Sequence, residues 1–435
     1  MSSFQIDGGR RLSGTVTTNA SKNAAVVLMN AALLNRGVTT LKNVPRIEEV
    51  NRIIEVLQSI GVGIRWSGQS SLILTPPRQL TPDAINYRSA IQTRSVLFLL
   101  PVLAHRHQSF RVPQPGGCRL GKRTVRPHLY ALEQFGISIR TSRKHYQVTA
   151  RELRPGPNVV LYESGDTVTE NAIMAAALIP GTTVIKFASA NYQVVDLCHF
   201  LTKLGVKITG IGSTTLKIEG RRLINQSVSY SITEDPIETM LFLAAAAVTR
   251  STITIRRCPI DFLELELLKL EKMGFRYKVI KRYLAHNGVT ALVDLKTSPS
   301  NLTALEEKIY ARPFPGINID NLPFFVPIAT QAKGTTLIFD WVYENRAIYY
   351  TELSKLGANI TLADPHRVYI AGPTTLRANE IICPPALRPS SIILVAMLAA
   401  KGRSLLRNIY SIERGYEDLC GRLGSLGAKI KKIES

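Results

Sequence analysis

The pattern that decides the fold is clearest in residues 167–210, which read TVTENAIMAAALIPGTTVIKFASANYQVVDLCHFLTKLGVKITG. An apolar, alanine-rich stretch predicts a first helix, and the β-branched run Thr182–Phe187 alternates as a half-buried strand does. A second helix follows and ends at Gly205, where glycine provides the left-handed cap without steric cost. The segment therefore predicts a helix, a strand, a second helix and another strand, in that order.

The same pattern recurs along the whole chain, notably in residues 330–362 and 387–432. Six glycines end the second helices at successive spacings of 75, 69, 69, 83 and 70 residues: Gly61, Gly136, Gly205, Gly274, Gly357 and Gly427. Units of this size exceed the roughly 20–50 residues of solenoid repeats and indicate an array of α/β subdomains. Because first helices such as Glu238–Val248 are apolar nearly all round, we expect helices inside and sheets outside. Dinucleotide and P-loop folds have no support, since no GxGxxG follows a strand and GxxxxGK[ST] is absent.

The composition is that of a globular protein with an unusual charge. The chain has 435 residues, 45% of them hydrophobic, and 54 Lys and Arg against 32 Asp and Glu, a net charge of +22. This surplus attracts anions, whether phosphorylated small molecules, acidic lipid or nucleic acid. The basic clusters lack the interleaved aromatic residues of nucleic-acid-binding motifs, so a nucleic-acid partner is not favoured despite the charge.

Cysteine usage and hydropathy indicate the compartment. Five cysteines lie far apart without a CxxC pair, and seven histidines lack ligand spacing, so we expect neither a disulfide framework nor a metal site. Residues 1–7 lack a basic-then-apolar signal. The longest apolar runs, Met240–Val248 and Ile392–Ala400, have nine residues, whereas a membrane span needs about 20. We therefore expect a cytoplasmic protein with no membrane partner; the sequence indicates no particular oligomeric state.

Residues 114–123, QPGGCRLGKR, place a thiol among basic side chains. Two glycines after a proline predict a mobile loop, and the cations near Cys118 favour its thiolate and attract an anionic substrate. On these residues alone, a chance cysteine in a basic surface loop is an equally open interpretation.

Four short motifs in successive repeats resemble those of the enolpyruvyl transferases: Ala20-Ser21-Lys22-Asn23-Ala24, Pro115-Gly116-Gly117-Cys118, Glu344-Asn345-Arg346 and Glu413-Arg414-Gly415-Tyr416. The resemblance covers the entire chain and implies a two-lobed, inside-out α/β barrel of six βαβαββ-type repeats, with buried helices and outer sheets. It also implies that residues 22–233 form the lobe with the mobile cysteine loop and that residues 1–21 and 234–435 form the second lobe. The active site is then expected in the cleft between them.

The resemblance further implies an enzyme that transfers the enolpyruvyl group of phosphoenolpyruvate without metal or organic cofactor. Its implied catalytic residues are Cys118, which protonates C3, Asp320, which takes the proton of the acceptor hydroxyl, and Lys22. The residues implied to bind phosphoenolpyruvate are Lys22, Asn23, Arg123, Arg346, Arg388 and Arg414. Guanidinium suits a planar carboxylate, and lysine suits a phosphate. Taken singly, each arginine is also explained as a solvated surface residue and Asp320 as a helix cap.

The branch of the family that these motifs match uses UDP-N-acetylglucosamine as acceptor, releases phosphate and begins peptidoglycan synthesis, hence cell-wall growth and division. The positions that match its sugar-nucleotide contacts are Asn23, Arg94, Arg123, Thr124, Val125, Arg126, Pro127, Asp320 and Val342. The sequence departs from the family pattern at three places on the acceptor side. Arg126 replaces an acidic residue, Gly165–Thr169 replaces Ser-Val-Gly-Ala-Thr, and Ala386-Leu387-Arg388 replaces Asp-Leu-Arg. A guanidinium cannot accept a base N–H as a carboxylate does.

Other functions stay open beside this one. Shikimate 3-phosphate or a different nucleotide is an alternative acceptor, although enzymes of the shikimate branch do not rely on a loop cysteine. An RNA 3′-phosphate cyclase has the related fold, but its catalytic histidine cannot be located here. A non-catalytic, nucleic-acid-binding relative would use basic clusters such as Arg276, Lys278, Lys281 and Arg282, which are more often solvated faces.

Overall fold

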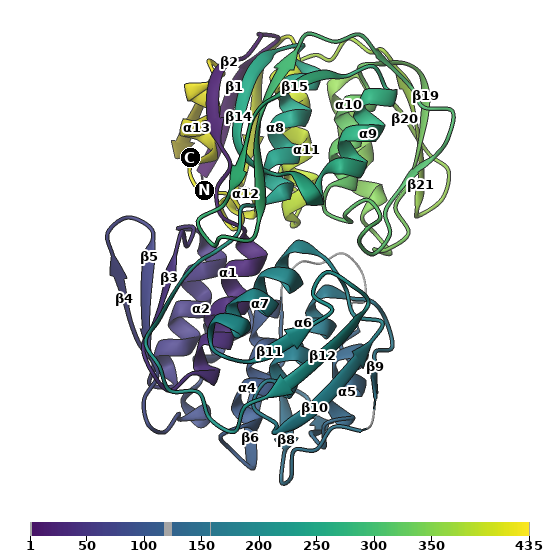
Figure 1. The fold of residues 1–435 in the computed structure, drawn as a ribbon. Coiled ribbons are helices and arrows are strands. Elements are labelled where there is room, and N and C mark those ends of the chain that lie inside the picture. The colour runs from purple at the N-terminus through teal and green to yellow at the C-terminus, as the bar shows by residue number, and fades with distance from the viewer. Residues whose placement is uncertain (1, 117–123, 157, 435) are drawn as a thin grey trace. The chain divides into compact units, whose positions relative to one another are not determined.

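The computed structural model describes residues 2–116, 124–156 and 158–434 (Figure 1). Helices and strands alternate throughout, which makes the chain a mixed α/β protein as the sequence predicts. The described residues divide into two compact units. We call residues 2–19 and 234–434 unit I, and residues 20–116, 124–156 and 158–233 unit II; each is described by itself.

The described part of unit II contains three sheets, none of which closes into a barrel. Its strands are β3 (Thr39–Lys42), β4 (Gly63–Ser67), β5 (Ser71–Thr75), β6 (Ser109–Pro113), β7 (Ser138–Thr141), β8 (His145–Thr149), β9 (Val159–Val160), β10 (Gly181–Lys186), β11 (Lys207–Thr209), β12 (Thr215–Gly220) and β13 (Val228–Ser231). The strand orders are β13-β3-β5-β4, β11-β12-β10-β9 and β6-β8-β7. In the first two sheets a single parallel strand joins three antiparallel ones.

The described part of unit I also forms three open sheets. Its strands are β1 (Ser2–Gly8), β2 (Ser13–Thr17), β14 (Thr252–Pro259), β15 (Arg276–Leu284), β16 (Ala291–Ser298), β17 (Leu302–Thr303), β18 (Ile309–Tyr310), β19 (Ala332–Phe339), β20 (Asn359–Leu362), β21 (Arg367–Gly372), β22 (Glu380–Ile382), β23 (Gly402–Arg407) and β24 (Lys429–Glu434). The orders are β22-β23-β1-β24, β15-β16-β14-β2 and β17-β19-β21-β20, with β18 also paired to β19. Each sheet again combines an antiparallel set with a parallel strand.

The helices of the two units range from fully buried to partly exposed. Those of unit II are α1 (Lys22–Ala31), η1 (Ala32–Leu34), α2 (Glu48–Ser59), η2 (Pro82–Ala84), α3 (Tyr87–Ala90), η3 (Arg94–Phe98), α4 (Leu99–Ala104), α5 (Arg126–Glu133), α6 (Asp166–Ala176) and α7 (Tyr192–Lys203). Those of unit I are α8 (Pro236–Val248), η4 (Ile260–Phe262), α9 (Glu264–Lys272), η5 (Leu322–Phe324), α10 (Phe325–Ala329), η6 (Ala347–Leu356), α11 (Leu387–Ala399), α12 (Tyr410–Glu413) and α13 (Leu419–Ser425). Figure 1 shows α8 and α11 between the sheet with β14 and the sheet with β19. Every residue of α8 is buried, which confirms the prediction for Glu238–Val248.

The six repeat-ending glycines all adopt the left-handed conformation, with φ between +80° and +96°. They follow α2, α5, α7, α9, η6 and α13, so each closes the second helix of its repeat as the sequence predicts. Only glycine adopts this conformation without steric cost, and the repeat can therefore be recognised in the sequence from the spacing of these glycines. One of the second helices, η6, has the tighter 3-10 geometry over its whole length.

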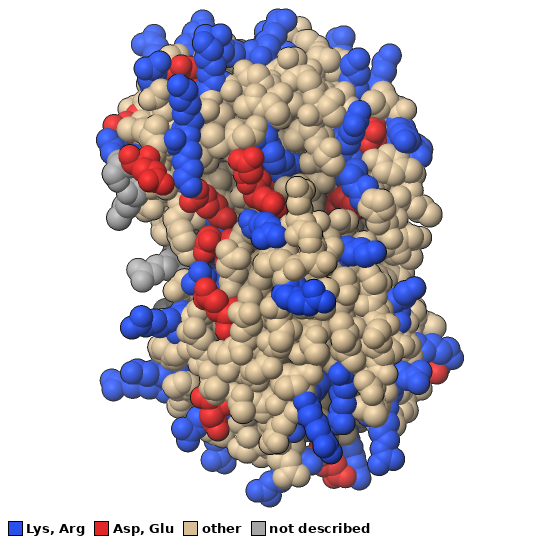
Figure 2. Space-filling model, turned by 90° about the vertical axis from the view of Figure 1, so that its left-hand side faces the viewer, with Lys and Arg blue, Asp and Glu red and all other residues tan. Residues whose placement is uncertain are grey.

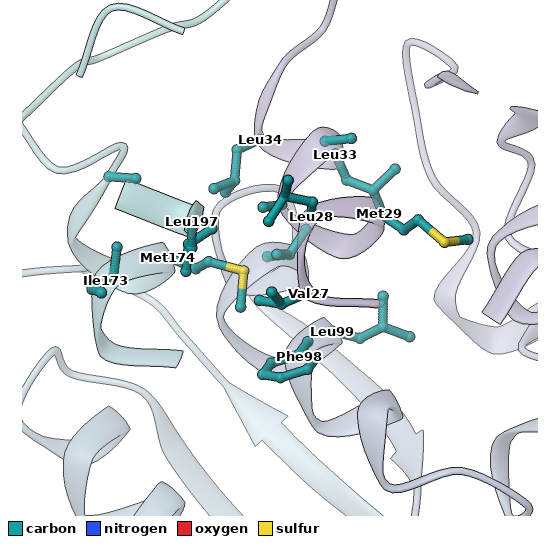
Figure 3. Close-up of a cluster of buried hydrophobic side chains, with 14 of the residues drawn as sticks. Val27, Leu28, Met29, Leu33, Leu34, Phe98, Leu99, Ile173, Met174 and Leu197 are labelled. Carbon is teal, nitrogen blue, oxygen red and sulfur yellow. The ribbon is translucent and has the colours of Figure 1, made fainter. Parts of the chain in front are cut away.

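The core of unit II shows how the buried helices pack. Figure 3 shows Val27, Leu28 and Met29 of α1 among side chains from α4, α6 and α7, including Leu99, Met174 and Leu197. Outside this core the surface is basic, and Lys and Arg side chains outnumber Asp and Glu across the face in Figure 2. Among the described residues, no helix is both long enough and apolar enough to cross a membrane.

The carboxyl group of Glu170 is fully buried in unit II. Its Oε1 accepts a hydrogen bond of 3.0 Å from Gln193 Nε2, and its Oε2 has no partner among the described residues. Burial raises the pKa of Glu170 well above its ordinary value, and the charge of Asp166 adds to the shift, whereas the bond from Gln193 opposes it. The folded protein therefore favours the protonated side chain.

Glu170→Gln is expected to raise the melting temperature at pH 8 by a few degrees and to change it little near pH 4. Because the folded pKa is raised, the protonated group stabilises the fold at low pH, and this contribution is lost as pH rises above the unfolded value of 4.5. The amide of glutamine stays neutral at every pH, so the variant does not lose this stability as the pH rises. Thermal melts of both proteins from pH 4 to 8 test this. Glu219→Gln, at an exposed ion pair with Lys207, is the control; an equal shift at all pH values would contradict the argument.

Candidate active site

A fully buried arginine, Arg346, lies at the start of η6 with 0% of its surface exposed. Its Nε is 2.6 Å from Oδ2 of Asp340, and its Nη2 is 2.8 Å from Oδ1, so the carboxylate holds the guanidinium by two parallel bonds. The hydroxyl of Tyr350 donates to Oδ2 of the same aspartate at 2.5 Å. A bidentate pair of this kind fixes the plane of the guanidinium as well as its position.

The third nitrogen of this guanidinium, Nη1, has no hydrogen-bond partner among the described residues. The carboxylate of Asp320 lies nearest to it, with Oδ1 at 3.8 Å, which is too far for a hydrogen bond. A buried charged donor without an acceptor is costly. Nη1 is therefore the nitrogen of Arg346 that is available to donate to an anionic ligand.

A second guanidinium, Arg388, faces the same carboxylate from the first turn of α11. Its Nη2 donates to Oδ2 of Asp320 at 3.1 Å, and its Nη1 donates to the hydroxyl of Tyr416 at 2.7 Å. Asp320 is 23% exposed, whereas Arg388 is 7% exposed. The two arginines thus share one partly exposed carboxylate, and this is the chemical centre of unit I.

Both arginines keep their charge despite burial. Burial alone would lower the pKa of each guanidinium, but a neighbouring tyrosine and aspartate act in the opposite direction and leave the pKa raised in both cases. Two fixed, charged guanidiniums suit a small ligand with carboxylate or phosphate oxygens, because each presents planar N–H donors.

The loop that carries Asp320 is held from α9. Glu266 Oε1 accepts from the backbone N–H of Asn318 at 3.0 Å and from Asn321 Nδ2 at 2.9 Å. Burial raises the pKa of Glu266, although the bonds from Asn321 and Asn318 lower it. The interpretation of Asp320 as a helix cap is wrong, because the residue before η5 is Asn321 and no side chain caps that helix.

Two further predicted residues lie on the segments that build this centre. Arg414 is half-buried and lies at the C-terminal end of α12. It precedes Gly415, where a Cβ would lie 2.2 Å from Leu387, and Tyr416, which contacts Arg388. Val342 is half-buried in the turn between Asp340 and Arg346.

Lys22 and Asn23 open helix α1 in unit II, where Ser21 Oγ caps the helix by accepting from Ala24 N at 3.1 Å. Both residues are half-buried, and Asn23 Nδ2 donates to the hydroxyl of Tyr192 at 3.1 Å. A lysine at a helix N-terminus adds its charge to the backbone N–H groups there, a combination suited to phosphate.

The predicted sugar-nucleotide residues of unit II come together in part. Arg94 Nη2 donates to the backbone oxygen of Thr124 at 2.8 Å. Val125 is half-buried, Pro127 is buried in the first turn of α5, and Arg126 is exposed at the first position of that helix. The backbone N–H of Arg126 donates to Thr124 Oγ1 at 3.2 Å, and the residue is exposed.

Cys118 and Arg123 lie outside the described residues. The described chain leads up to them through Gly116, where a Cβ would lie 1.8 Å from the backbone oxygen of Ile91. Glycine alone fits this close approach.

Sequence analysis did not identify the residues that hold the two arginines. Asp340, Tyr350 and Tyr416 contact them directly, and Glu266 fixes the loop of Asp320. The spacing gave no signal for Tyr350, since it follows Arg346 by four residues and side chains three apart share a face of a 3-10 helix such as η6.

Comparisons with known proteins identify the family of the chain. A sequence model of the family described as EPSP synthase (3-phosphoshikimate 1-carboxyvinyltransferase) matches residues 6–423. A UDP-N-acetylglucosamine 1-carboxyvinyltransferase from Bradyrhizobium diazoefficiens is 34% identical over 438 residues, 99% of this chain and 98% of that one. The protein of the same name from Treponema denticola is 35% identical over 439 residues and covers 100% of both chains.

Solved structures show the same fold. The enolpyruvyl transferase NikO from Streptomyces tendae has a TM-score of 0.84 at 24% identity, covering 100% of this chain and 99% of that one. An EPSP synthase from Acinetobacter baumannii has a TM-score of 0.78 at 16% identity, covering both chains completely. With the full-length sequence matches, these likenesses show that the chain belongs to the enolpyruvyl (1-carboxyvinyl) transferase family and is an enolpyruvyl transferase.

Proposed function

We propose that this enzyme transfers the enolpyruvyl group of phosphoenolpyruvate to the 3-hydroxyl of UDP-N-acetylglucosamine and releases phosphate, the step that commits the sugar to peptidoglycan synthesis and hence to cell-wall growth and division. The observation that carries the proposal is the buried Nη1 of Arg346, a charged donor with no hydrogen-bond partner among the described residues. The names of the full-length relatives support UDP-N-acetylglucosamine as the acceptor.

The donor substrate has the chemistry that the arginine pair requires. Phosphoenolpyruvate carries a planar carboxylate and a phosphate, and Arg346 and Arg388 present charged N–H donors at a shared carboxylate. Lys22, Arg123 and Arg414 are proposed to complete its binding with Asn23, as the family motifs imply.

The proposed reaction is an addition followed by an elimination. Cys118 gives a proton to C3 of phosphoenolpyruvate, which makes C2 electrophilic, while the acceptor hydroxyl attacks C2 and passes its proton to Asp320. The tetrahedral ketal then loses a C3 proton to the Cys118 thiolate, and the electrons of that C–H bond form the C2=C3 double bond as the C2–O bond to phosphate breaks. Phosphate leaves with the electrons of the C2–O bond and takes up the proton held by Asp320. Lys22 and the arginines stabilise the negative charge on the leaving group.

The proposed acceptor residues are Arg94, Thr124 and Val125 with Pro127 and Val342, joined by Asn23, Arg123 and Asp320. One observation favours a second candidate, transfer to a different acceptor. Arg126 is exposed at the start of α5, where the family has an acidic residue, and its guanidinium cannot accept a base N–H.

Phosphate release from phosphoenolpyruvate tests the two candidates directly. UDP-N-acetylglucosamine, shikimate 3-phosphate, UMP and no acceptor are supplied in separate reactions. Release with UDP-N-acetylglucosamine alone is the expected result, and it would show that Arg126 is tolerated in the acceptor pocket. Release with another acceptor and none with UDP-N-acetylglucosamine would reject the proposed acceptor and keep the donor chemistry.

A further inference from the structure

The hairpin of β15 and β16 combines positive charge with exposed aliphatic side chains. β15 is an edge strand of its sheet. Residues 272–298 contain a single acidic residue, Asp294, which is buried and accepts bonds from Tyr283 and from the backbone of Arg257. The basic residues of the strands, all exposed, are Arg276, Lys278, Lys281, Arg282 and Lys296.

The positive charge of the hairpin is not balanced by ion pairs with described residues. None of its five basic strand residues forms an ion pair with a described residue. Lys278 also lies directly opposite Lys296 in the strand register, and like charges in that relation destabilise a sheet. An anionic partner would relieve this repulsion.

Aliphatic side chains stand out from the same hairpin. A β-bulge between Val279 and Lys281 interrupts the pairing with β16. Ile280 in this bulge is 53% exposed, Leu284 at the end of β15 is 62% exposed, and Val289 in the turn is 44% exposed. Basic residues on an edge strand guard against aggregation, but that role does not explain the aliphatic residues among them.

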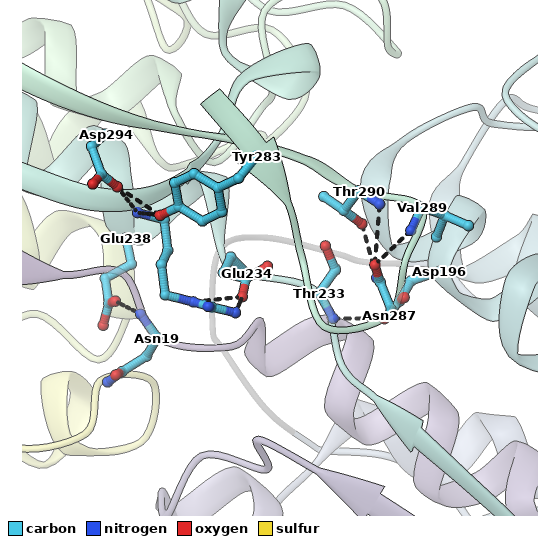
Figure 4. A network of polar contacts seen from close by, with 11 residues as sticks. Asn19, Asp196, Thr233, Glu234, Glu238, Tyr283, Asn287, Val289, Thr290 and Asp294 are labelled. Carbon is cyan, nitrogen blue, oxygen red and sulfur yellow. Dashed lines mark hydrogen bonds and ion pairs between the residues drawn. The ribbon is translucent and has the colours of Figure 1, made fainter. Parts of the chain in front are cut away.

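The tip that presents Leu284 and Val289 is internally ordered. Asn287 Oδ1 accepts from the backbone N–H groups of Val289 and Thr290, each at 3.1 Å, and its Nδ2 donates to Thr290 Oγ1 at 2.9 Å (Figure 4). The backbone N–H of Ala285 closes the turn on Thr290 at 2.8 Å. The apolar groups are therefore held in place before any partner binds.

We infer that this hairpin is a docking surface for an anionic lipid bilayer. Aliphatic side chains that enter the headgroup region, flanked by cations that attract acidic lipid, are the chemistry of peripheral membrane binding. Nucleic acid fits less well, because single strands are bound by stacking on exposed aromatic rings. The two tyrosines of β15 are half-buried, and their hydroxyls bond to Glu271 and Asp294. The inference is independent of the identity of the acceptor.

Co-sedimentation of the full chain with vesicles tests the docking surface. We expect binding to vesicles of phosphatidylcholine with phosphatidylglycerol and none to phosphatidylcholine alone. Lys278→Gln, Lys281→Gln and Arg282→Gln combined should weaken binding on the order of 10²-fold, since each basic residue near an acidic surface contributes about fivefold. Ile280→Thr with Leu284→Thr should weaken it about tenfold while the charge is unchanged.

Matched controls remove the same groups elsewhere. Arg140→Gln, Arg143→Gln and Lys144→Gln take three exposed charges from the β7–β8 hairpin, and Ile382→Thr removes an aliphatic side chain that is 66% exposed. Both should bind vesicles as the unmodified protein does. Equal weakening by the two charge variants, or no weakening by the aliphatic pair, would overturn the inference.

Three further measurements test the docking surface. In Leu284→Trp, the fluorescence of the introduced tryptophan should shift to shorter wavelength with the acidic vesicles, and an unchanged spectrum would contradict docking at this tip.

A short DNA duplex and a single strand are offered in competition with the vesicles. If nucleic acid binds more tightly than vesicles through the same residues, the surface belongs to nucleic acid and the lipid assignment is wrong. Phosphate release by every variant should equal that of the unmodified enzyme, because the hairpin contains no residue of the candidate active site.

Discussion

Asp340→Asn is expected to lower kcat/KM for phosphoenolpyruvate by about 10²-fold, chiefly through a higher KM for that substrate. Asp340 holds Arg346 through bonds of 2.6 and 2.8 Å, and removal of one partner of a buried charge pair costs about 2–5 kcal/mol, where 1.4 kcal/mol is a tenfold change. The amide keeps the size of the side chain but loses one acceptor and the charge. Steady-state kinetics with each substrate varied in turn measures the effect.

A comparison of the KM for phosphoenolpyruvate with the KM for the acceptor distinguishes a role of Asp340 in positioning Arg346 from general damage to the fold. We expect the KM for the acceptor to change little, because the hydrogen bonds of Asp340 among the described residues go to Arg346, Tyr350 and His366, none of which is a predicted acceptor residue. Tyr350→Phe removes one hydrogen bond to Asp340 and leaves the charge pair, so a smaller loss of about tenfold is expected. A fall in melting temperature with unchanged kinetics in both variants would show that Asp340 is structural only.

Cys118→Ser is expected to lower kcat at neutral pH by about 10²–10⁴-fold, the usual contribution of a positioned proton donor. A serine hydroxyl is a much weaker acid than a thiol, so it protonates C3 of phosphoenolpyruvate poorly. The melting temperature should stay the same, because the change is a single atom. Phosphate release under saturating substrates provides the measurement.

Another cysteine of the chain provides the matched control. Cys420 is half-buried, and burial raises the pKa of its thiol. Cys420→Ser makes the same chemical change away from the motifs and should leave kcat within about twofold of the original value. Unchanged turnover in Cys118→Ser would remove this thiol from the mechanism.

The ends of helices and the burial of helices could be predicted because single residues and short segments indicate them. A glycine at the end of a helix marks a left-handed backbone, and all six predicted glycines have it. The apolar surface of Glu238–Val248 on all sides required a buried helix, and α8 is buried throughout. The likeness of short motifs then indicated the enolpyruvyl transferase family, which the full-length relatives confirm.

The contacts that make the site could not be predicted in the same way. Arg388 and Asp320 are 68 residues apart, and Glu266 and Asn318 are 52 apart, so neither pairing leaves a periodic signal in the sequence. The sequence also carries no signal for the role of Asp340. It follows a strand like many polar residues, and only the structure shows its carboxylate bonded to a buried guanidinium.

The sequence by itself determined the repeat, the burial of the first helices, the excess of positive charge and the family, because each of these depends on residue type and short spacing. Only the tertiary structure decided which arginines are buried, which carboxylate two guanidiniums share and which nitrogen has no hydrogen-bond partner among the described residues. These properties arise from the packing of β19, η6, α9 and α11, and the energy of a buried charge depends on every group around it rather than on its neighbours in the chain.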